Sequence, residues 1–242
     1  MKRVIIIGAT SGIGYEVAKD YLKMGWRVGV AGRREDALEK FRSMAPNMVE
    51  IQPLDVTRDD APEKLQILID KLGGMNLFLL SSGIGSQNLE LKPEIEINTA
   101  RTNVVGFVRM VTAAFNYFKQ QGGGHLAVIS SIAGTKGLGS APAYSATKRF
   151  QNSYINALAQ LAHMEKLNIR FTDIRPGFVE TDLLKDRDYP LLMKPERVAA
   201  HIIKALNRNK RIIMIDRRYA IIVFFWRMIP LWIWERLPIK NK

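Results

Sequence analysis

The chain opens with Arg3-Val4-Ile5-Ile6-Ile7-Gly8-Ala9-Thr10-Ser11-Gly12-Ile13-Gly14, and this stretch decides its fold. The β-branched run before Gly8 is long enough for a buried strand, and an amphipathic helical pattern follows the glycines through Lys23. Gly8 permits a tight turn, Gly12 lets backbone amides approach a pyrophosphate, and Gly14 lets helix and strand pack closely. An ordinary strand-to-helix turn also fits a glycine-rich loop, but this position favours nucleotide binding.

The next strand, Arg27 to Ala31, ends at Gly32-Arg33-Arg34, close to where an adenosine ribose would lie in such a unit. A site for NAD usually places a carboxylate here to accept from the ribose 2′-hydroxyl, and Gly32 offers none. Arg33 and Arg34 carry planar guanidinium groups that suit a 2′-phosphate, so the sequence predicts NADP(H), with Arg33 the favoured ligand. The alternative is two solvated arginines that open a helix from Glu35 to Met44.

Tyr144 and Lys148 stand four residues apart at the start of a predicted helix, after the serine pair Ser130-Ser131. Residues at i and i+4 share one helix face, so an ammonium can lie beneath a phenol. A nearby fixed cation stabilises a phenolate, which predicts a pKa for Tyr144 below the ordinary value of about 10. This arrangement suits a proton-donating tyrosine, although Tyr and Lys also meet by chance on helix surfaces.

Together these motifs resemble the short-chain dehydrogenase/reductase family over nearly the whole chain, to about residue 218. The resemblance implies an active-site quartet of Asn103, Ser131, Tyr144 and Lys148. Ser131 is preferred over Ser130 because thirteen positions separate it from Tyr144, the usual family interval. The implied reaction is hydride exchange between nicotinamide and a ketone or secondary alcohol, in which Tyr144 donates the proton and Ser131 hydrogen-bonds the same oxygen. Lys148 would bind the nicotinamide ribose, and Asn103 would hold a water that links Lys148 to solvent.

The resemblance also assigns the cofactor contacts. Asp55 and Val56 would meet the adenine, and Thr181 would meet the nicotinamide carboxamide. The full predicted cofactor site consists of Gly8, Thr10, Ser11, Gly12, Ile13, Gly14, Arg33, Arg34, Asp55, Val56, Ser82, Gly83, Tyr144, Lys148, Pro176, Gly177, Val179 and Thr181. Two positions depart from the family pattern: Ile7 stands where Thr is common, and Ser81-Ser82-Gly83 stands where Asn-Ala-Gly is common. These departures put in question the hydrogen bonds that usually brace the central strands.

Length and composition predict one α/β domain with a doubly wound parallel sheet, the Rossmann fold. The 242 residues are 47% apolar, enough for one substantial core. Further strand-like runs alternate with helical patterns, which implies a sheet covered on both faces. These runs are Met48 to Ile51, Asn76 to Ser81, His125 to Ser130, Ile169 to Ile174 and Arg211 to Ile215. Gly73-Gly74 and Gly122-Gly123-Gly124 are typical helix ends. We expect a catalytic domain over residues 1–218 and an apolar, basic tail over 219–242.

Cysteine is absent, which excludes disulfides, thiolate metal sites and a cysteine nucleophile. The histidines, His125, His163 and His201, lie far apart in sequence, so we predict no metal site and expect them to be solvated or on helix surfaces. The apolar stretch at the N-terminus is too short for a secretory signal, which predicts a cytoplasmic enzyme.

The segment 182–193 occupies the place where the family puts its substrate lid. Its apolar residues alternate irregularly with charges, which favours a mobile flap over an apolar substrate. The alternative is a surface loop with incidental leucines.

The segment 219–234 holds three of the four tryptophans, and Arg227 and Pro230 interrupt it well short of the roughly 20 residues that span a bilayer. Aromatic rings beside cations, in a chain of net charge +13, suit contact with the anionic inner face of a membrane. An equally supported alternative is that this segment packs on the core, over the substrate entrance or between subunits. The cations are Arg217, Arg218, Arg227, Arg236, Lys240 and Lys242.

Three functions are compatible with the sequence. The first is an NADP-dependent oxidoreductase of a lipid-like ketone or alcohol, such as a 3-keto lipid or a steroid, and the second is the same chemistry on a small soluble carbonyl. The third is a non-enzymatic nucleotide-binding module with a basic surface. Dispersed basic residues and the lack of a nucleic-acid motif disfavour it, so we expect no nucleic-acid partner. The resemblance further implies a homodimer or homotetramer, built partly through the helices that bear Asn103 and Tyr144.

Overall fold

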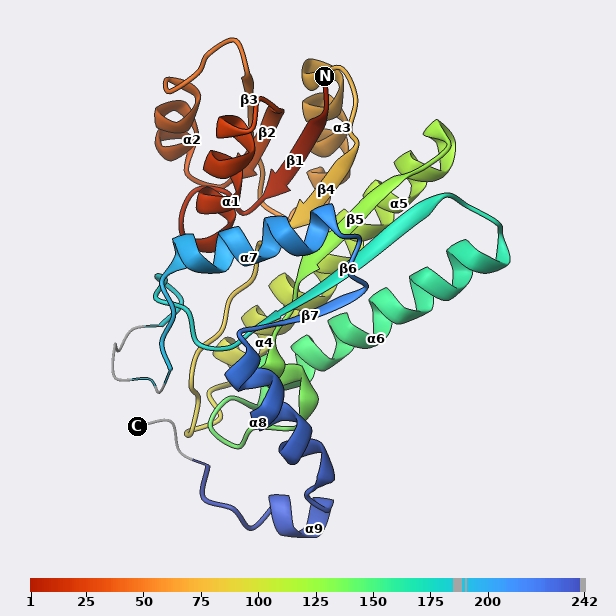
Figure 1. Cartoon of the computed structure of the whole chain (residues 1–242). Coiled ribbons are helices and arrows are strands. Elements are labelled where there is room, and N and C mark those ends of the chain that lie inside the picture. Colours follow the sequence, from red (N-terminus) through yellow and green to blue (C-terminus); the bar gives the residue numbers. More distant parts are fainter. Residues whose placement is uncertain (185–188, 190, 240–242) are drawn as a thin grey trace.

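The computed structural model of the chain describes residues 1–184, 189 and 191–239 (Figure 1). Within these residues, seven parallel strands form one sheet in the order β3-β2-β1-β4-β5-β6-β7. The strands are β1 (Arg3–Ile7), β2 (Arg27–Gly32), β3 (Val49–Pro53), β4 (Leu77–Leu80), β5 (Gly124–Ile129), β6 (Ile169–Pro176) and β7 (Ile212–Ile215). The α-helices are α1 (Gly12–Lys23), α2 (Glu35–Arg42), α3 (Ala61–Leu72), α4 (Pro93–Ala100), α5 (Phe107–Gln121), α6 (Pro142–Met164), α7 (Pro195–Asn207), α8 (Arg217–Met228) and α9 (Leu231–Trp234). A π-helical turn, η1 (Arg101–Gly106), joins α4 to α5, and a 3-10 turn, η2 (Ile132–Thr135), follows β5.

The doubly wound parallel sheet expected from the sequence is confirmed. Each predicted strand is present, but β3 and β6 run two residues further than their apolar runs, because pairing continues past the apolar residues, as between Gly32 and Pro53. Gly73 and Gly122 end α3 and α5 with φ of +78° and +88°, the left-handed conformation that glycine adopts without strain.

Helices cover both faces of the sheet, and successive side chains of each strand serve opposite faces (Figure 1). In β1, Val4 and Ile6 join a core formed with α1, α2 and α7. Ile5 and Ile7 join a second core formed with α3, α5 and α6. This two-sided burial explains why β1 reads as a continuous apolar run.

The order of strands reverses between β1 and β4, which are neighbours in the sheet but not in the chain. Such a switch point leaves a crevice at the carboxyl ends of the strands, where ligands bind in open α/β sheets. The glycine loop follows β1 at this edge, Ser81-Ser82-Gly83 follow β4, and the serine pair follows β5. The fold therefore brings most of the predicted site residues to one edge.

The apolar tail continues the fold through α8, so the expected boundary after residue 218 falls inside this helix. Tyr219 and Val223 are buried in the core shared with α1 and α7. The indole Nε1 of Trp234 donates to the Gly137 carbonyl at 2.7 Å, which fastens the tail near the carboxyl ends of the strands. None of the helices in residues 1–184 and 191–239 is long and apolar enough to cross a membrane.

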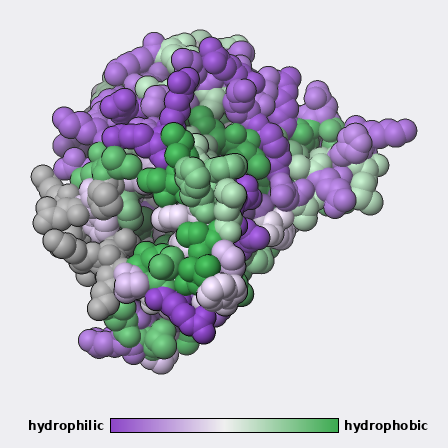
Figure 2. Space-filling model, turned by 60° about the horizontal axis from the view of Figure 1, so that its bottom comes forward, coloured by the Kyte–Doolittle hydropathy of each residue, from purple (hydrophilic) through white to green (hydrophobic). Residues whose placement is uncertain are grey.

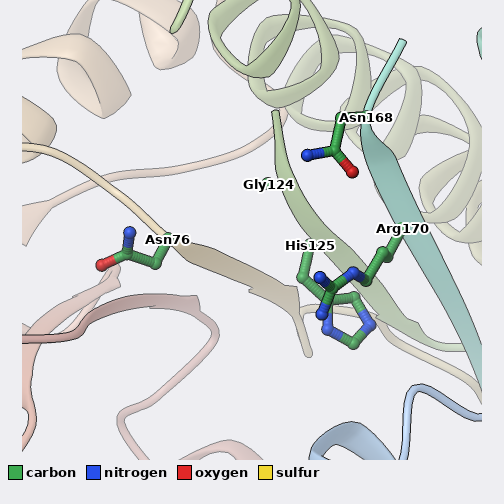
Figure 3. A pocket seen from close by; sticks show the side chains of 5 residues that line it. All are labelled: Asn76, Gly124, His125, Asn168 and Arg170. Atoms are coloured by element: carbon green, nitrogen blue, oxygen red, sulfur yellow. The ribbon is translucent and has the colours of Figure 1, made fainter. Parts of the chain in front are cut away.

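His125 corrects the expectation that all three histidines are solvated or on helix surfaces. It lies in β5 and its Nε2 is 2.8 Å from Thr172 Oγ1, with burial and nearby Arg170 lowering its pKa to about 4. The sequence could not show this, because an isolated His in a strand carries no sign of its cross-strand partner. His125 and Arg170 converge on a hollow at the amino ends of the strands, with Asn76 and Asn168 at its margins (Figure 3). This hollow lies at the opposite end of the sheet from the glycine loop.

Candidate active site

The glycine loop after β1 closes tightly on the end of β4. Gly8 has a φ of +89°, and a Cβ there would lie 2.5 Å from the backbone nitrogen of Ser82. A Cβ at Gly14 would lie 2.2 Å from the Gly8 carbonyl oxygen. Neither position has room for a side chain, so contact with backbone requires both glycines, and the φ of Gly8 is a second reason for glycine there.

The N-terminus of α1 is open toward a ligand. Ser11, its N-cap, makes no side-chain cap hydrogen bond, and the first turn holds no acidic residue. The first amides and the positive end of the helix dipole therefore suit an anion. Gly12 has a φ of +60°, and a Cβ there would lie 3.1 Å from Thr181 Cγ2, so Thr181 faces the loop from β6's side. Ile13 instead packs partly on the core. These features fit a dinucleotide pyrophosphate.

The end of β2 fits a phosphate better than a carboxylate partner. A Cβ at Gly32 would lie 2.7 Å from Thr10 Cγ2, so an acidic side chain at this position would collide with the glycine loop. Arg34 Nη2 donates to Thr10 Oγ1 at 3.2 Å, which ties the loop to the start of α2. Arg33 is exposed beside it. The arrangement leaves cationic groups next to the predicted ribose position.

Asp55 and Val56 follow β3, as expected for the adenine side of the site. Asp55 Oδ1 accepts from the backbone nitrogen of Thr57 at 2.9 Å and from Thr57 Oγ1 at 2.8 Å, which fixes the carboxylate. Val56 is buried against η1, where a Cβ at Gly106 would lie 2.7 Å from Val56 Cγ2.

The quartet predicted for catalysis is brought together from three elements. Ser131 caps η2, where its Oγ accepts from the Ala133 nitrogen at 3.0 Å, while Tyr144 and Lys148 lie on the first turns of α6. Lys148 Nζ is 5.7 Å from the centre of the Tyr144 ring. A Cβ at Gly83 would lie 3.3 Å from Asn103 Oδ1 and 3.5 Å from Lys148 Nζ, so these polar atoms meet beside the loop after β4.

Lys148 is a buried cation. Its Nζ donates to the Ile129 carbonyl and to Gln151 Oε1, each at 3.1 Å, and the residue is only 4% exposed. Burial lowers the pKa of Lys148 to about 8, against the opposing effect of the nearby Asp173 carboxylate. The ammonium is thus held ready to lose its proton near neutral pH.

Tyr144 differs from the expectation of a lowered pKa. Burial raises its pKa above the ordinary value, and a hydrogen bond with the Ser131 side chain offsets part of this rise. The Lys148 ammonium does not lower the pKa of Tyr144 as expected, because it lies over the ring and donates to Ile129 and Gln151. Gly85, which the sequence did not single out, helps to bury the ring: a Cβ there would lie 2.4 Å from Tyr144 Cδ2.

Asn103 and Lys148 are joined through Gln151, which sequence reasoning missed. Gln151 Nε2 donates to the Asn103 carbonyl at 2.9 Å, while its Oε1 accepts from Lys148. The Asn103 side chain bonds both polar groups of the Ile84 backbone, at 2.9 and 2.7 Å, and Thr147 Oγ1 at 3.2 Å. Gln151 lies three residues after Lys148, a spacing that places both on one helix face and that was available as a signal.

Comparison with known proteins identifies the family that has this fold and these motifs. A family model described as short chain dehydrogenase matches residues 2–190, most of the chain. The chain belongs to the short-chain dehydrogenase/reductase family. It is thus an NAD(P)-dependent dehydrogenase or reductase, as the sequence predicted.

Individual relatives of this short-chain dehydrogenase/reductase also match it over most of its length. A protein of Myxococcus xanthus (strain DK1622) named as an uncharacterized oxidoreductase is 32% identical over 196 residues, 78% of this chain and 77% of that protein. A solved 3-ketoacyl-(acyl-carrier-protein) reductase from Brucella melitensis, complexed with NADH, aligns with a TM-score of 0.79 at 24% identity, covering 89% of this chain and 96% of that one. An alcohol dehydrogenase from Thermococcus sibiricus, complexed with 5-hydroxy-NADP, aligns with a TM-score of 0.78 at 23% identity and the same coverage. These two structures show the shared fold.

Behind the quartet, this short-chain dehydrogenase/reductase holds a buried polar cluster that sequence reasoning also missed. Arg175 Nε and Nη2 donate to Asp173 Oδ2 at 2.8 and 2.6 Å, and both residues are buried in β6. Ser130 Oγ donates to the other carboxylate oxygen, and Asn152 Nδ2 donates to Ser130 Oγ at 2.8 Å. The signal was a pair of opposite charges two residues apart, a spacing that places both side chains on one face of the strand.

The remaining predicted residues lie along the rim of the site. Pro176 ends β6, and a Cβ at Gly177 would lie 2.3 Å from the Tyr219 ring, so the tail packs directly on this turn. Val179 forms a bridge with Met193, which closes the base of the expected lid. The ring centres of Phe178 and Tyr189 are 4.6 Å apart. Residues 185–188 and 190 of the expected lid lie outside the described residues.

Proposed function

We propose that this enzyme is an NADP-dependent reductase that converts an apolar ketone to a secondary alcohol, with Asn103, Ser131, Tyr144 and Lys148 as its active-site quartet. The observation that carries the proposal is the meeting of Ser131, Tyr144 and Lys148 at the carboxyl edge of the sheet, beside an uncapped helix N-terminus. The bound cofactor supplies the hydride.

The proton comes from Tyr144 in this proposal. The raised pKa of Tyr144 keeps its hydroxyl protonated at neutral pH, so it is ready to donate as negative charge develops on the carbonyl oxygen. The Ser131 hydroxyl donates to the same oxygen and strengthens its bond as charge grows. Lys148 binds the nicotinamide ribose hydroxyls, and its ammonium, with a pKa of about 8, replaces the proton that Tyr144 gives up.

Preference for NADP over NAD rests on the end of β2. Thr10 occupies the space that an acidic side chain at position 32 would need, which removes the usual partner of a free 2′-hydroxyl. Arg33 is exposed at the same point and supplies a bidentate guanidinium for a 2′-phosphate. The first-turn amides of α1 hold the pyrophosphate, Asp55 and Val56 border the adenine, and Thr181 borders the nicotinamide.

An apolar, lipid-like substrate is supported by the rim of the site. Phe178 and Tyr189 stack loosely there, and Leu191 packs partly on the core below them. Such a rim favours a 3-keto lipid or a ketosteroid over a small polar carbonyl. A small soluble carbonyl remains the second candidate and differs in needing no apolar contact beyond the reacting carbon. Self-association as a homodimer or homotetramer, partly through η1 with Asn103 and α6 with Tyr144, stays a prediction.

A spectrophotometric screen tests the reaction. NADPH oxidation is followed with long-chain 3-keto compounds, ketosteroids and small aldehydes, using the native enzyme and Tyr144→Phe. We expect oxidation with an apolar ketone and loss of about 100-fold or more in Tyr144→Phe. Oxidation of small aldehydes alone would favour the second candidate, and oxidation by both proteins at one rate would contradict the role of Tyr144.

A binding measurement tests the cofactor. We expect the native enzyme to bind NADPH more tightly than NADH, and Arg33→Ala to narrow that gap about tenfold or more while NADH affinity stays the same. Arg34→Ala is the comparison variant: its guanidinium is turned to Thr10 in the glycine loop, so its loss should change NADPH and NADH affinity alike and leave the gap between them. Equal native affinities for the two cofactors would contradict the 2′-phosphate site.

A further inference from the structure

The outer side of α8 and α9 carries a concentration of exposed apolar side chains. We call this surface the tail face, and it consists of Ile221, Phe224, Phe225, Met228, Leu231 and Trp232, each about 60% exposed. Phe224, Phe225 and Trp232 are also the large aromatic side chains that stand exposed among the residues the structure describes. Figure 2, which brings the lower end of the molecule forward, shows hydrophobic surface gathered at this end and hydrophilic residues along the opposite margin.

The tail face is distinct from the side of α8 that packs on the core. The inner side of α8 already packs on the body of the protein through Tyr219 and Val223, and Trp234 anchors α9. The helix is therefore apolar on both sides, a pattern typical of a helix that is covered all round. Exposed apolar patches of this kind mark sites of protein or membrane interaction.

The charges around the tail face select one of these partners. Between residues 217 and 239 the chain carries four arginines and one glutamate, a net charge of +3. Arg227 is exposed in the last turn of α8, and the Arg236 guanidinium lies 5.9 Å from the centre of the Trp232 ring. Aromatic rings with arginines close by suit the boundary of an anionic lipid headgroup layer.

The tail that carries this face packs against segments of the candidate active site. Tyr219 OH accepts from the Phe178 nitrogen at 3.2 Å, and Trp234 bonds Gly137, which lies between Ser131 and Tyr144 in the chain. Lys136 Nζ donates to the Ile229 carbonyl. These contacts fix the tail to the turn after β6 and to the segment after η2, so a surface bound by the tail face lies next to the candidate active site.

We infer that the tail face is a docking surface for an anionic lipid bilayer, held by the aromatic side chains in the headgroup region and by the arginines at lipid phosphates. Docking itself is independent of the proposed reaction. Its consequence, that an apolar ketone enters the site from the membrane, rests on the proposed function.

Vesicle co-sedimentation of the full chain tests the docking. The probes are phosphatidylcholine vesicles with and without phosphatidylglycerol, at low and high salt. We expect binding that needs phosphatidylglycerol, weakens at high salt, and falls about tenfold or more in the triple variant Phe224→Ser, Phe225→Ser, Trp232→Ser. The control is Met24→Ser with Met44→Ser, which removes exposed apolar groups at the amino ends of the strands and should bind like the native protein.

Two further measurements separate the outcomes. Circular dichroism and NADPH affinity establish that the triple variant is folded, because none of its three side chains belongs to the core or the cofactor site. Without vesicles, the triple variant and the native protein should reduce a water-soluble ketone at the same rate. If the native protein shows no such activity, that result would count against the proposed function alone. Equal vesicle binding by native and triple variant would overturn the docking proposal. The proposal would also be overturned if the native protein is a dimer that binds no vesicles and the triple variant is a monomer, because a second copy would then cover the tail face.

Discussion

Lys148→Met removes a buried cation, and its effect on stability can be worked out from the structure. The pKa of Lys148 is about 8 in the folded protein, against an ordinary 10.5. Each pKa unit corresponds to about 1.4 kcal/mol, so the charged amine opposes folding by about 3 kcal/mol in the protein without cofactor. Burial is the dominant cause, and the residue is 4% exposed, so solvent screening takes little from this value.

The sign of the pH dependence follows from which state holds the proton. Below pH 8 the amine is charged in both states, and the folded protein bears the whole penalty. Between pH 8 and 10.5 the folded state has lost the proton while the unfolded chain keeps it, so the native protein gains stability as pH rises. The gain between pH 7 and pH 10 should be about 2 to 3 kcal/mol relative to Lys148→Met, which has no amine to titrate.

Urea unfolding followed by circular dichroism at a series of pH values measures this difference. Groups that titrate in both proteins cancel when the two free energies of unfolding are subtracted. Lys40→Met is the matched control, because it makes the same substitution at an exposed amine. A flat difference for Lys148→Met, or one that changes in the opposite direction, would refute the buried-cation argument. The same variant should be inactive, which makes Lys148 a case of function retained at a cost in stability.

Three further changes test the neighbouring contacts. Gln151→Glu places a carboxylate 3.1 Å from the Lys148 ammonium and should move the stability step to higher pH in the same unfolding series; an unmoved step would contradict the contact. Asp173→Asn leaves the buried Arg175 charge without its carboxylate and should cost about 3 to 5 kcal/mol in urea unfolding, whereas a loss below about 1 kcal/mol would mean that the pair is not buried as described. Gly8→Ala introduces a Cβ 2.5 Å from backbone at a φ of +89° and should cost about 2 kcal/mol or more and weaken NADPH binding; calorimetry with unchanged stability and affinity would count against the tight loop.

The fold was accessible from sequence because its determinants are periodic and local. The apolar run of β1, the glycines after it and the alternation of strands and helices each reflect backbone geometry, which neighbouring residues largely fix. Tyr144 and Lys148 were found for the same reason, since four positions on a helix determine a shared face. The strand ends were less exact, as at β3, because pairing and not apolarity sets where a strand stops.

The electrostatics of the site were not accessible in this way. The raised pKa of Tyr144 depends on how deeply the ring is buried, and the direction of the Lys148 ammonium depends on Ile129 and Gln151, which are brought to it by tertiary contact. The Asp173–Arg175 pair was visible in the sequence of β6, but its partners Ser130, which follows β5, and Asn152, on α6, were not. Burial and partners between distant segments follow from packing, which a single sequence does not specify.

The tail shows the same division between pattern and packing. Its apolar and basic composition predicted contact either with a membrane or with the core, the substrate entrance or a second subunit, and the inner side packs on the core. Only the exposed side, with Phe224 and Trp232, is left for a partner.

The role of Tyr144 in hydride transfer can be measured with NADPH deuterated at nicotinamide C4 and an apolar ketone. In a single turnover with saturating cofactor, we expect deuterium on the carbinol carbon with the native enzyme, and transfer about 100-fold or more slower with Tyr144→Phe at undiminished NADPH affinity. Transfer by Tyr144→Phe at the native rate would contradict that role.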